Sequence, residues 1–141
     1  MKKIKLQTVV DEIESASEIY TCFYDMETGE TVAIFDPDFA GSKEENEELA
    51  ELIDSQPGRF IRFPTQFEIH EYSIMEDFMF SLKPGIVQQR LARALRGKGS
   101  FRYFKDTIAD FDIEDSWYSF RANAYREIAI RWCKDNGLEI E

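Results

Sequence analysis

YTCFYDMETGETVAIF, residues 20–35, is the stretch that decides the fold. Its two ends, Tyr20–Tyr24 and Thr31–Phe35, are rich in β-branched and aromatic residues, which favour strands. Between them stands Glu27-Thr28-Gly29, where the glycine supplies the left-handed backbone that a tight loop requires. The stretch therefore predicts an antiparallel β-hairpin.

Helical patterns lie on both sides of this hairpin. Apolar residues recur at helical spacing from Leu6 to about Ser17, which predicts an amphipathic helix. After the hairpin, a capping box of Ser42 and Glu45 opens a strongly acidic helix that is expected to end near Asp54. A third strand is expected at Arg59–Phe63, and the proline that follows it ends the strand.

The second half of the chain reads as helical. Pro84 suits the first position of a helix and Gly137 a C-terminal cap. Four helices are expected, at Gln66–Leu82, Pro84–Arg96, Gly99–Asp110 and Glu114–Asn136. The fold class is therefore α+β: an N-terminal helix, a small three-stranded antiparallel sheet and a C-terminal helical half packed on one face of it.

Length and composition predict one domain over residues 1–141. The chain has 141 residues, of which 43% are apolar, enough for a core without disulfides. Cys22 and Cys133 have no metal or redox spacing, and the N-terminus has no apolar signal segment. No apolar run approaches the roughly 20 residues that span a bilayer. We expect a cytoplasmic protein without a membrane partner.

Charge is distributed unevenly along the chain. The net charge is −11, yet Lys83–Lys105 contains seven basic residues and no acidic one. Overall acidity opposes non-specific binding of polyanions, but a concentrated basic patch still acts at contact range because salt screens distant charges. This segment is therefore the expected place of a functional site.

The basic segment predicts an anion-binding surface. Three of its arginines share one helix face, and the start of the next helix offers free backbone amides to an anion. The predicted anion-binding residues are Arg90, Arg93, Arg96, Lys98, Gly99, Ser100, Arg102 and Lys105. The alternative is a solvated face that offsets the acidic N-terminal half, for example by pairing with the helix of residues 44–54. Periodicity places Phe101 and Phe104 on the buried stripe and leaves Tyr103 free.

Three further sequence features do not match a nucleotide, metal or catalytic site. Gly97-Lys98-Gly99-Ser100 lacks the earlier glycine of a nucleotide P-loop and follows a helix instead of a strand. Asp36, Asp38 and Glu47 have part of the EF-hand spacing, but Ala40 occupies a ligand position. The single histidine, His70, has no cysteine or second histidine near it in a metal-ligand spacing, and the sequence contains no nucleophile elbow. We predict no metal, no cofactor and no catalytic residue.

Two charged residues stand on apolar helix faces. Glu71 lies between Phe78 and Leu82 on its helix, and Arg121 lies between Ile128 and Trp132 on the last one. A buried charge without a partner costs several kcal/mol, so the hypothesis is that Glu71 and Arg121 form a buried ion pair where the helices meet. A role in fixing the helix register is favoured over a catalytic one.

Four segments together resemble one of the bacterial uncharacterised protein families of the UPF series. They are RFIRFP at 59–64, EYSIMEDF at 71–78, GKGSFRYFKD at 97–106 and WYSFR at 117–121. The resemblance covers most of the chain. It implies a cytosolic bacterial protein and brings no activity, cofactor or catalytic residue with it.

Three classes of function remain. The leading hypothesis is a non-enzymatic binding module for a phosphate-rich ligand such as RNA or a nucleotide, using the basic face around residues 90–105. The alternative is a protein–protein adaptor or homodimer that uses the acidic 44–54 helix and the basic face. An enzyme is the least supported, because no nucleophile and base stand in a recognisable arrangement.

Overall fold

The computed structural model describes residues 3–17, 19–35 and 43–141, and its architecture is α+β as predicted. The chain divides into two compact units. Residues 1–69 and 125–141 form the first, which we call the sheet unit, and residues 70–124 form the second, the helical unit. The expectation of a single domain stays a prediction.

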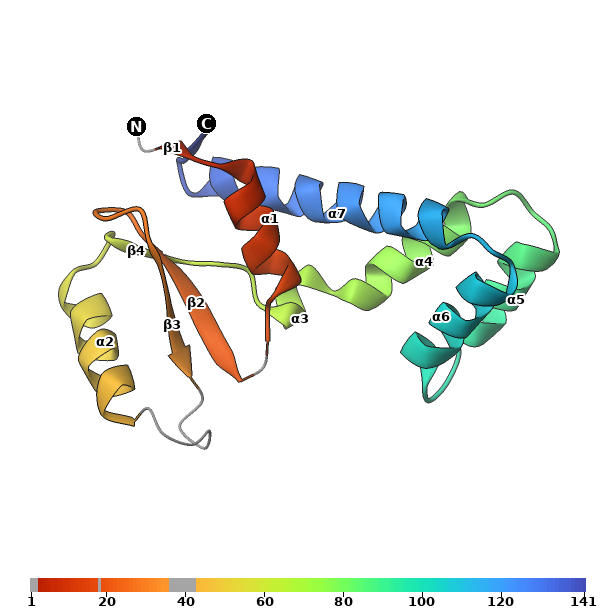
Figure 1. Cartoon of the computed structure of the whole chain (residues 1–141), viewed down its shortest axis with the longest axis horizontal. Coiled ribbons are helices and arrows are strands. Elements are labelled where there is room, and N and C mark those ends of the chain that lie inside the picture. Colours follow the sequence, from red (N-terminus) through yellow and green to blue (C-terminus); the bar gives the residue numbers. More distant parts are fainter. Residues whose placement is uncertain (1–2, 18, 36–42) are drawn as a thin grey trace. The chain divides into compact units, whose positions relative to one another are not determined.

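A three-stranded antiparallel sheet organises the sheet unit (Figure 1). Strand β2 (Tyr20–Asp25) lies between β3 (Thr31–Phe35) and β4 (Phe60–Arg62). The predicted hairpin is confirmed, with Cys22 opposite Ala33. Gly29 has the expected left-handed backbone, with φ 78°, and its N–H donates to the Asp25 carbonyl at 2.8 Å.

A second, two-stranded sheet joins the two ends of the sheet unit. Strand β1 (Lys3–Ile4) pairs in parallel with β5 (Glu139–Ile140), and helix α1 (Leu6–Glu14) follows β1 directly. The sequence analysis predicted neither short strand. Ile4 is buried, so this pairing also adds to the core.

Helix α2 (Lys43–Ser55) covers the end of edge strand β3. The Asn46 side chain accepts from the Phe35 N–H at 3.1 Å and donates to the Phe35 carbonyl at 2.7 Å. These bonds satisfy backbone groups that an edge strand otherwise exposes to other chains. The predicted capping serine, Ser42, and the calcium-like loop from Asp36 to Gly41 lie outside the described residues.

The core of the sheet unit is completed by the C-terminal half of α7 (Glu114–Asp135) and by α3 (Gln66–Ile69). Trp132 stacks on Phe63 with ring centroids 4.7 Å apart, and its indole N–H donates to the Arg62 carbonyl at 2.9 Å. Burying an indole without such a bond would cost a hydrogen bond to water. Further buried residues of this unit are Val9, Ile13, Tyr24, Ile69, Tyr125, Ala129, Cys133 and Leu138.

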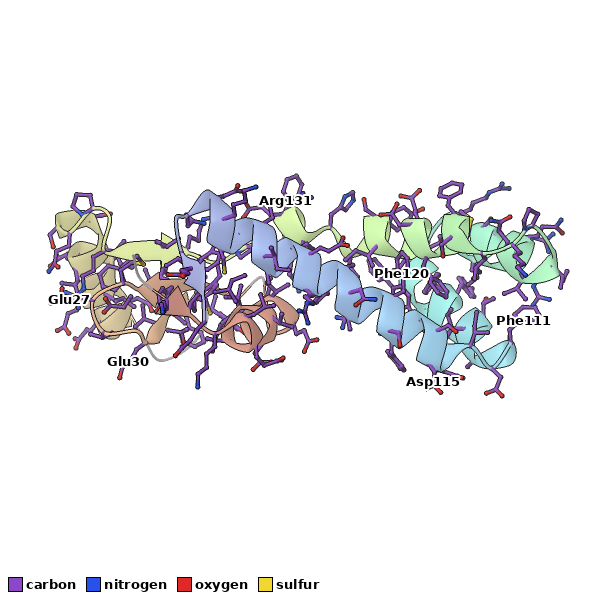
Figure 2. All side chains as sticks on the ribbon, turned by 90° about the horizontal axis from the view of Figure 1, so that it is seen from above. Glu27, Glu30, Phe111, Asp115, Phe120 and Arg131 are labelled. Carbon is purple, nitrogen blue, oxygen red and sulfur yellow. The ribbon has the colours of Figure 1, made fainter. Side chains whose placement is uncertain are left out.

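Aromatic rings fill the core of the helical unit. It comprises α4 (Glu71–Ser81), α5 (Ile86–Ala94), α6 (Ser100–Asp110) and the first part of α7. Phe78 of α4 contacts Trp117 at 5.4 Å and Phe120, labelled in Figure 2, at 5.3 Å between ring centroids. Trp117 also contacts Phe104 of α6 at 4.8 Å. These edge-to-face contacts connect three of the helices.

The predicted helix Gln66–Leu82 is wrong as a single element, because the chain breaks it at His70. His70 has φ 53° and ψ 64°, a left-handed conformation that ends α3 before α4 begins. Its Nδ1 lies 2.7 Å from the Ser73 hydroxyl oxygen. The break removes α3 from the register of α4, and Phe67 of α3 is 92% exposed.

The predicted start of the next helix at Pro84 is also wrong. Helix α5 begins at Ile86, and Gly85 is its N-cap residue, with an extended backbone at φ 164°. The extended glycine interrupts the helical conformation that a first-turn proline would have entered.

Candidate anion-binding surface

The predicted basic residues are on the surface of the helical unit. Arg90 and Arg93 project from α5, and Arg102 and Lys105 project from α6. All the predicted cations are exposed, and we call this set the basic surface: Arg90, Arg93, Arg96, Lys98, Arg102 and Lys105. Within residues 70–124, all of which the structure describes, none of them forms an ion pair with a carboxylate. Their charges are available to an external anion.

Gly99 and Ser100 form the turn into α6. Gly99 is the N-cap residue with φ 74°, and no side chain caps this helix start. A Cβ at position 99 would lie 3.3 Å from the Tyr103 ring, so the ring packs closely against the glycine. The left-handed backbone favours glycine here, and a larger residue would also have to displace the Tyr103 ring by a few tenths of an ångström. The turn therefore presents first-turn amides and an aromatic ring next to Lys98 and Arg102.

The prediction that Phe101 belongs to the buried stripe of α6 is wrong. Its side chain is 49% exposed, and Tyr103 is 57% exposed, whereas Phe104 is fully buried. The buried stripe of α6 is centred on Phe104 and Ile108, with Thr107 on its other side, donating its hydroxyl proton to the Tyr103 carbonyl at 2.8 Å. Phe101 lies at the margin of this stripe, so two rings stand exposed among the cations.

Arg90 makes an aromatic contact at the far end of α6. Its guanidinium carbon lies 5.8 Å from the centroid of the Phe111 ring, which Figure 2 labels. A cation over a ring face gains about 0.5–1 kcal/mol at an exposed site and keeps its charge open to solvent. Arg90 is thus oriented without being neutralised.

A groove of about 420 Å³ lies between α4 and α5, next to the basic surface. Met79 and Leu95 line it together with the 70% exposed ring of Phe80, and Arg96 stands at its margin. The Tyr72 hydroxyl donates to the Leu95 carbonyl at 2.6 Å, which ties the two helices together. Sequence reasoning missed this groove because it arises only from the packing of one helix against another.

Glu71 and Arg121 meet, as hypothesised, across α4 and α7. The Arg121 Nε donates to Glu71 Oε1 at 2.7 Å. Their side chains are 27–29% exposed, so the pair is partly open to solvent instead of buried. This position fits a role in helix register and leaves the pair within reach of water.

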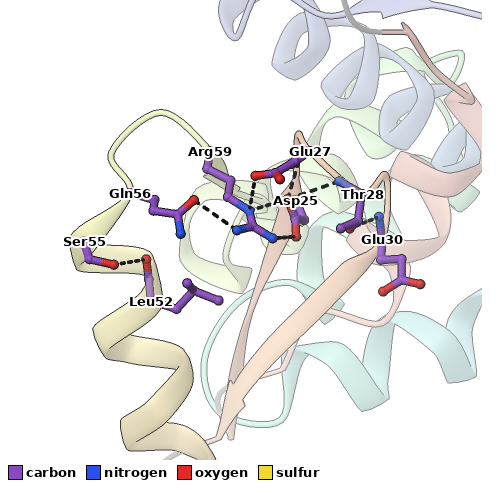
Figure 3. A network of polar contacts seen from close by, with 8 residues as sticks. All are labelled: Asp25, Glu27, Thr28, Glu30, Leu52, Ser55, Gln56 and Arg59. Atoms are coloured by element: carbon purple, nitrogen blue, oxygen red, sulfur yellow. Dashed lines mark hydrogen bonds and ion pairs between the residues drawn. The ribbon is translucent and has the colours of Figure 1, made fainter.

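A second ionic network, which the sequence analysis missed, lies in the sheet unit (Figure 3). Asp25 accepts two hydrogen bonds from Arg59, from Nε and Nη2, each at 2.9 Å. The Glu27 backbone N–H adds another at 2.9 Å, and Arg59 Nη1 donates to Gln56 at 3.0 Å. The Arg59 guanidinium holds the pKa of Asp25 well below its usual range. No spacing rule connects positions 25 and 59, so only the strand pairing could have revealed this contact.

Two absences concern the described part of the chain. No three His, Cys, Asp or Glu side chains of residues 3–17, 19–35 and 43–141 converge as a set of metal ligands. Each helix in these ranges is too short or too polar to cross a lipid bilayer.

Comparison with known proteins places the chain in a family. The model of the uncharacterised protein family UPF0158 matches residues 2–140. The chain belongs to UPF0158. This agrees with the resemblance drawn from the motifs at 59–64, 71–78, 97–106 and 117–121.

One curated UPF0158 relative is bacterial. UPF0158 protein PA5073 of Pseudomonas aeruginosa is 25% identical over 93 residues, which is 65% of this chain and 61% of that protein. The match therefore spans less than two thirds of the relative's length. No solved structure matches the chain.

Proposed function

We propose that the helical unit of this UPF0158 member is a binding module for single-stranded nucleic acid. One observation carries the proposal: the cations of the basic surface, which form no ion pair within residues 70–124, are interleaved with the exposed rings of Phe101 and Tyr103. Arginine and lysine attract phosphates, and exposed rings stack on unpaired bases. A surface that offers both cations and exposed rings suits a ligand that has both phosphates and unpaired bases.

The distribution of the cations favours a polyanion over a single phosphate. They extend over two helices and the turn between them, and all of them are exposed. A single phosphate would contact only some of these charges, whereas a strand with several phosphates can contact them in succession. The helical unit as a whole is neutral, with eight basic and eight acidic side chains, so the remainder of the chain carries all of the −11. Binding should therefore weaken steeply as salt rises.

The two free thiols, Cys22 and Cys133, support a location in a reducing compartment such as the cytosol, where RNA is present. Burial and the neighbouring Glu12 raise the pKa of the Cys22 thiol to about 12, so this thiol is suited to neither nucleophilic catalysis nor redox exchange. The high pKa argues against a catalytic role for Cys22.

Fluorescence anisotropy with labelled single-stranded RNA of mixed sequence tests the proposal. We expect saturable binding whose affinity falls with salt, and a double Arg93→Glu, Arg96→Glu variant should bind at least about tenfold more weakly. A double Arg126→Glu, Arg131→Glu variant is the matched control with the same change of charge, because both are exposed arginines of the sheet unit (Arg131 is labelled in Figure 2) and their change should matter little. Equal affinities of wild type and the double variant would rule the proposal out.

A Phe101→Ala variant separates stacking from charge. Stacking one base contributes about 1–3 kcal/mol, so this variant should lose about fivefold or more in affinity and keep its salt dependence. Inorganic polyphosphate serves as the competitor without bases. If polyphosphate displaces RNA completely and Phe101→Ala binds RNA normally, the ligand is a polyanion recognised by charge alone.

Self-association is the second candidate. Helix α2 exposes Glu44, Glu47, Glu48 and Glu51, and the basic surface of another copy offers complementary charge. Light scattering at low and high salt distinguishes the two functions. A dimer that dissociates as salt rises, together with no RNA binding, would favour self-association.

A further inference from the structure

The sheet unit contains an open cavity of about 470 Å³ that the proposed function does not use. It lies between the end of α1, the start of β2 and the segment that connects β4 with α3. Its volume is within the roughly 300–1,000 Å³ of small-molecule sites in proteins. The cavity is therefore large enough for a metabolite.

The lining combines one carboxylate with three aromatic rings. Among the described lining residues, Glu12 is the one with an ionisable carboxyl group, and Tyr20, Phe63 and Phe67 contribute the rings. Cys22 also lines the cavity, and burial together with the nearby Glu12 raises the pKa of its thiol to about 12. Because the thiol remains protonated, it adds no charge of its own, and the carboxylate determines the charge of the cavity.

The rings are held in different ways. Phe63 is 2% exposed and fixed by its stack on Trp132, so it forms part of the floor. The Tyr20 hydroxyl donates to the Ser15 carbonyl, which fixes that ring. Phe67 is 92% exposed, an unusual position for a phenylalanine. A ligand with an apolar portion would cover this ring and remove its surface from water.

We propose that this cavity binds a small organic cation, with its ammonium or guanidinium group paired to Glu12 and its carbon skeleton against the three rings. An anion would be repelled by Glu12 and by the net charge of −11 that the sheet unit carries. A neutral ligand would displace water from the carboxylate without replacing its charge interactions. A cation gains from both the carboxylate and the ring faces, which attract positive charge.

This inference is independent of the nucleic-acid proposal. The cavity belongs to the sheet unit and the basic surface to the helical unit, and the two ligands have opposite charge. Either proposal can fail without the other.

Isothermal titration of the whole chain tests the proposal with butane-1,4-diamine, agmatine and choline as probes. Butane-1,4-diol is the neutral probe of matched length, and succinate is the anionic one. We expect at least one cation to bind saturably and neither the diol nor succinate to do so. If none of the three cations binds at millimolar concentration, or if the diol binds as well as the diamine, the proposal is wrong.

Two variants assign the binding to this cavity. Glu12→Gln keeps the shape of the side chain and removes its charge, so affinity should fall about tenfold or more. Glu14→Gln, an exposed glutamate outside the lining, is the matched control and should bind like wild type. Phe67→Ala should weaken binding several-fold, and the exposure of Phe67 means that its removal should leave the melting temperature unchanged. Wild-type affinity in both Glu12→Gln and Phe67→Ala would place the cation elsewhere and overturn the assignment.

Discussion

In the sheet unit, Arg59 donates hydrogen bonds to both oxygens of Asp25 and a further one to Gln56, whereas Arg93 and Arg96 in the helical unit form no ion pair within residues 70–124. The same residue type therefore has two roles. A guanidinium whose donors are satisfied by its own chain contributes to stability and has little to offer a ligand. An unpaired, exposed guanidinium contributes little to stability and remains available to an outside anion. Variants at the two places should separate these roles.

Removing Asp25 should have the largest effect. Asp25 is 4% exposed, and Asp25→Ala removes the carboxylate that accepts from the Arg59 guanidinium and from the Glu27 backbone amide. We expect the free energy of unfolding in urea to fall by roughly 3 kcal/mol. Glu27→Gln is the control, because the Glu27 side chain is 67% exposed and its contact with Arg59 should contribute less than about 0.5 kcal/mol. A loss below about 1 kcal/mol for Asp25→Ala would remove the contrast between the two regions.

Lowering the pH should show the contribution of the Asp25–Arg59 network to stability. Arg59 holds the pKa of Asp25 below its usual range, and Arg62 lowers the pKa of Glu68 to about 2. A carboxyl group whose pKa falls on folding stabilises the protein above its unfolded pKa, and this stability is lost as pH falls toward the folded value. The free energy of unfolding should therefore be steady down to about pH 5 and fall between about pH 4.5 and 2. Asp25→Asn should flatten this decline, and an unchanged slope would contradict the assignment.

Glu71→Ala should have a smaller effect than Asp25→Ala. The Glu71–Arg121 pair is 27–29% exposed, so water compensates part of the lost interaction. We expect a loss of about 1 kcal/mol in the free energy of unfolding. A double-mutant cycle with Arg121→Ala measures the coupling directly. A coupling near 3 kcal/mol would show that the pair is as important as Asp25–Arg59.

Arg93→Gln should have the smallest effect on stability. Because Arg93 is exposed and has no carboxylate partner within residues 70–124, the free energy of unfolding should change by less than about 0.5 kcal/mol. RNA affinity should fall in the same variant. A clear destabilisation would mean that Arg93 is a structural residue, like Arg59.

Local patterns predicted the parts of the fold that depend on local chemistry. The hairpin followed from the alternation around Glu27-Thr28-Gly29 and from the need for glycine at its turn. The starts of α6 and α7 were also close to their predicted positions, Gly99 and Glu114. The contact between Glu71 and Arg121 could also be predicted, because a charge on an apolar helix face requires a partner.

Features that depend on distant contacts were missed. Strands β1 and β5 have two residues each, too few to show a pattern, and their pairing joins the two ends of the sheet unit. The left-handed backbone at His70 breaks a helix that the apolar periodicity predicted to be continuous. The break was not predicted, because histidine has no strong preference against helix. Phe101 lies at the margin of the buried stripe of α6, where the position of a residue around the helix axis does not by itself predict whether its side chain is buried or exposed. The Asp25–Arg59 contact and both cavities required the tertiary arrangement.

The division of the chain also has a consequence for its biosynthesis. The helical unit is one uninterrupted segment, 70–124, while the sheet unit needs Trp132, Cys133 and Leu138 from residues made after it. The ribosome therefore completes the helical unit while strands β1 and β4 still lack their contacts with β5 and Trp132. During that interval, part of the apolar surface of the sheet unit, including the face of Phe63 that Trp132 later covers, stands open to nascent-chain chaperones. Completion of the sheet unit therefore waits for residues that are synthesised after the helical unit.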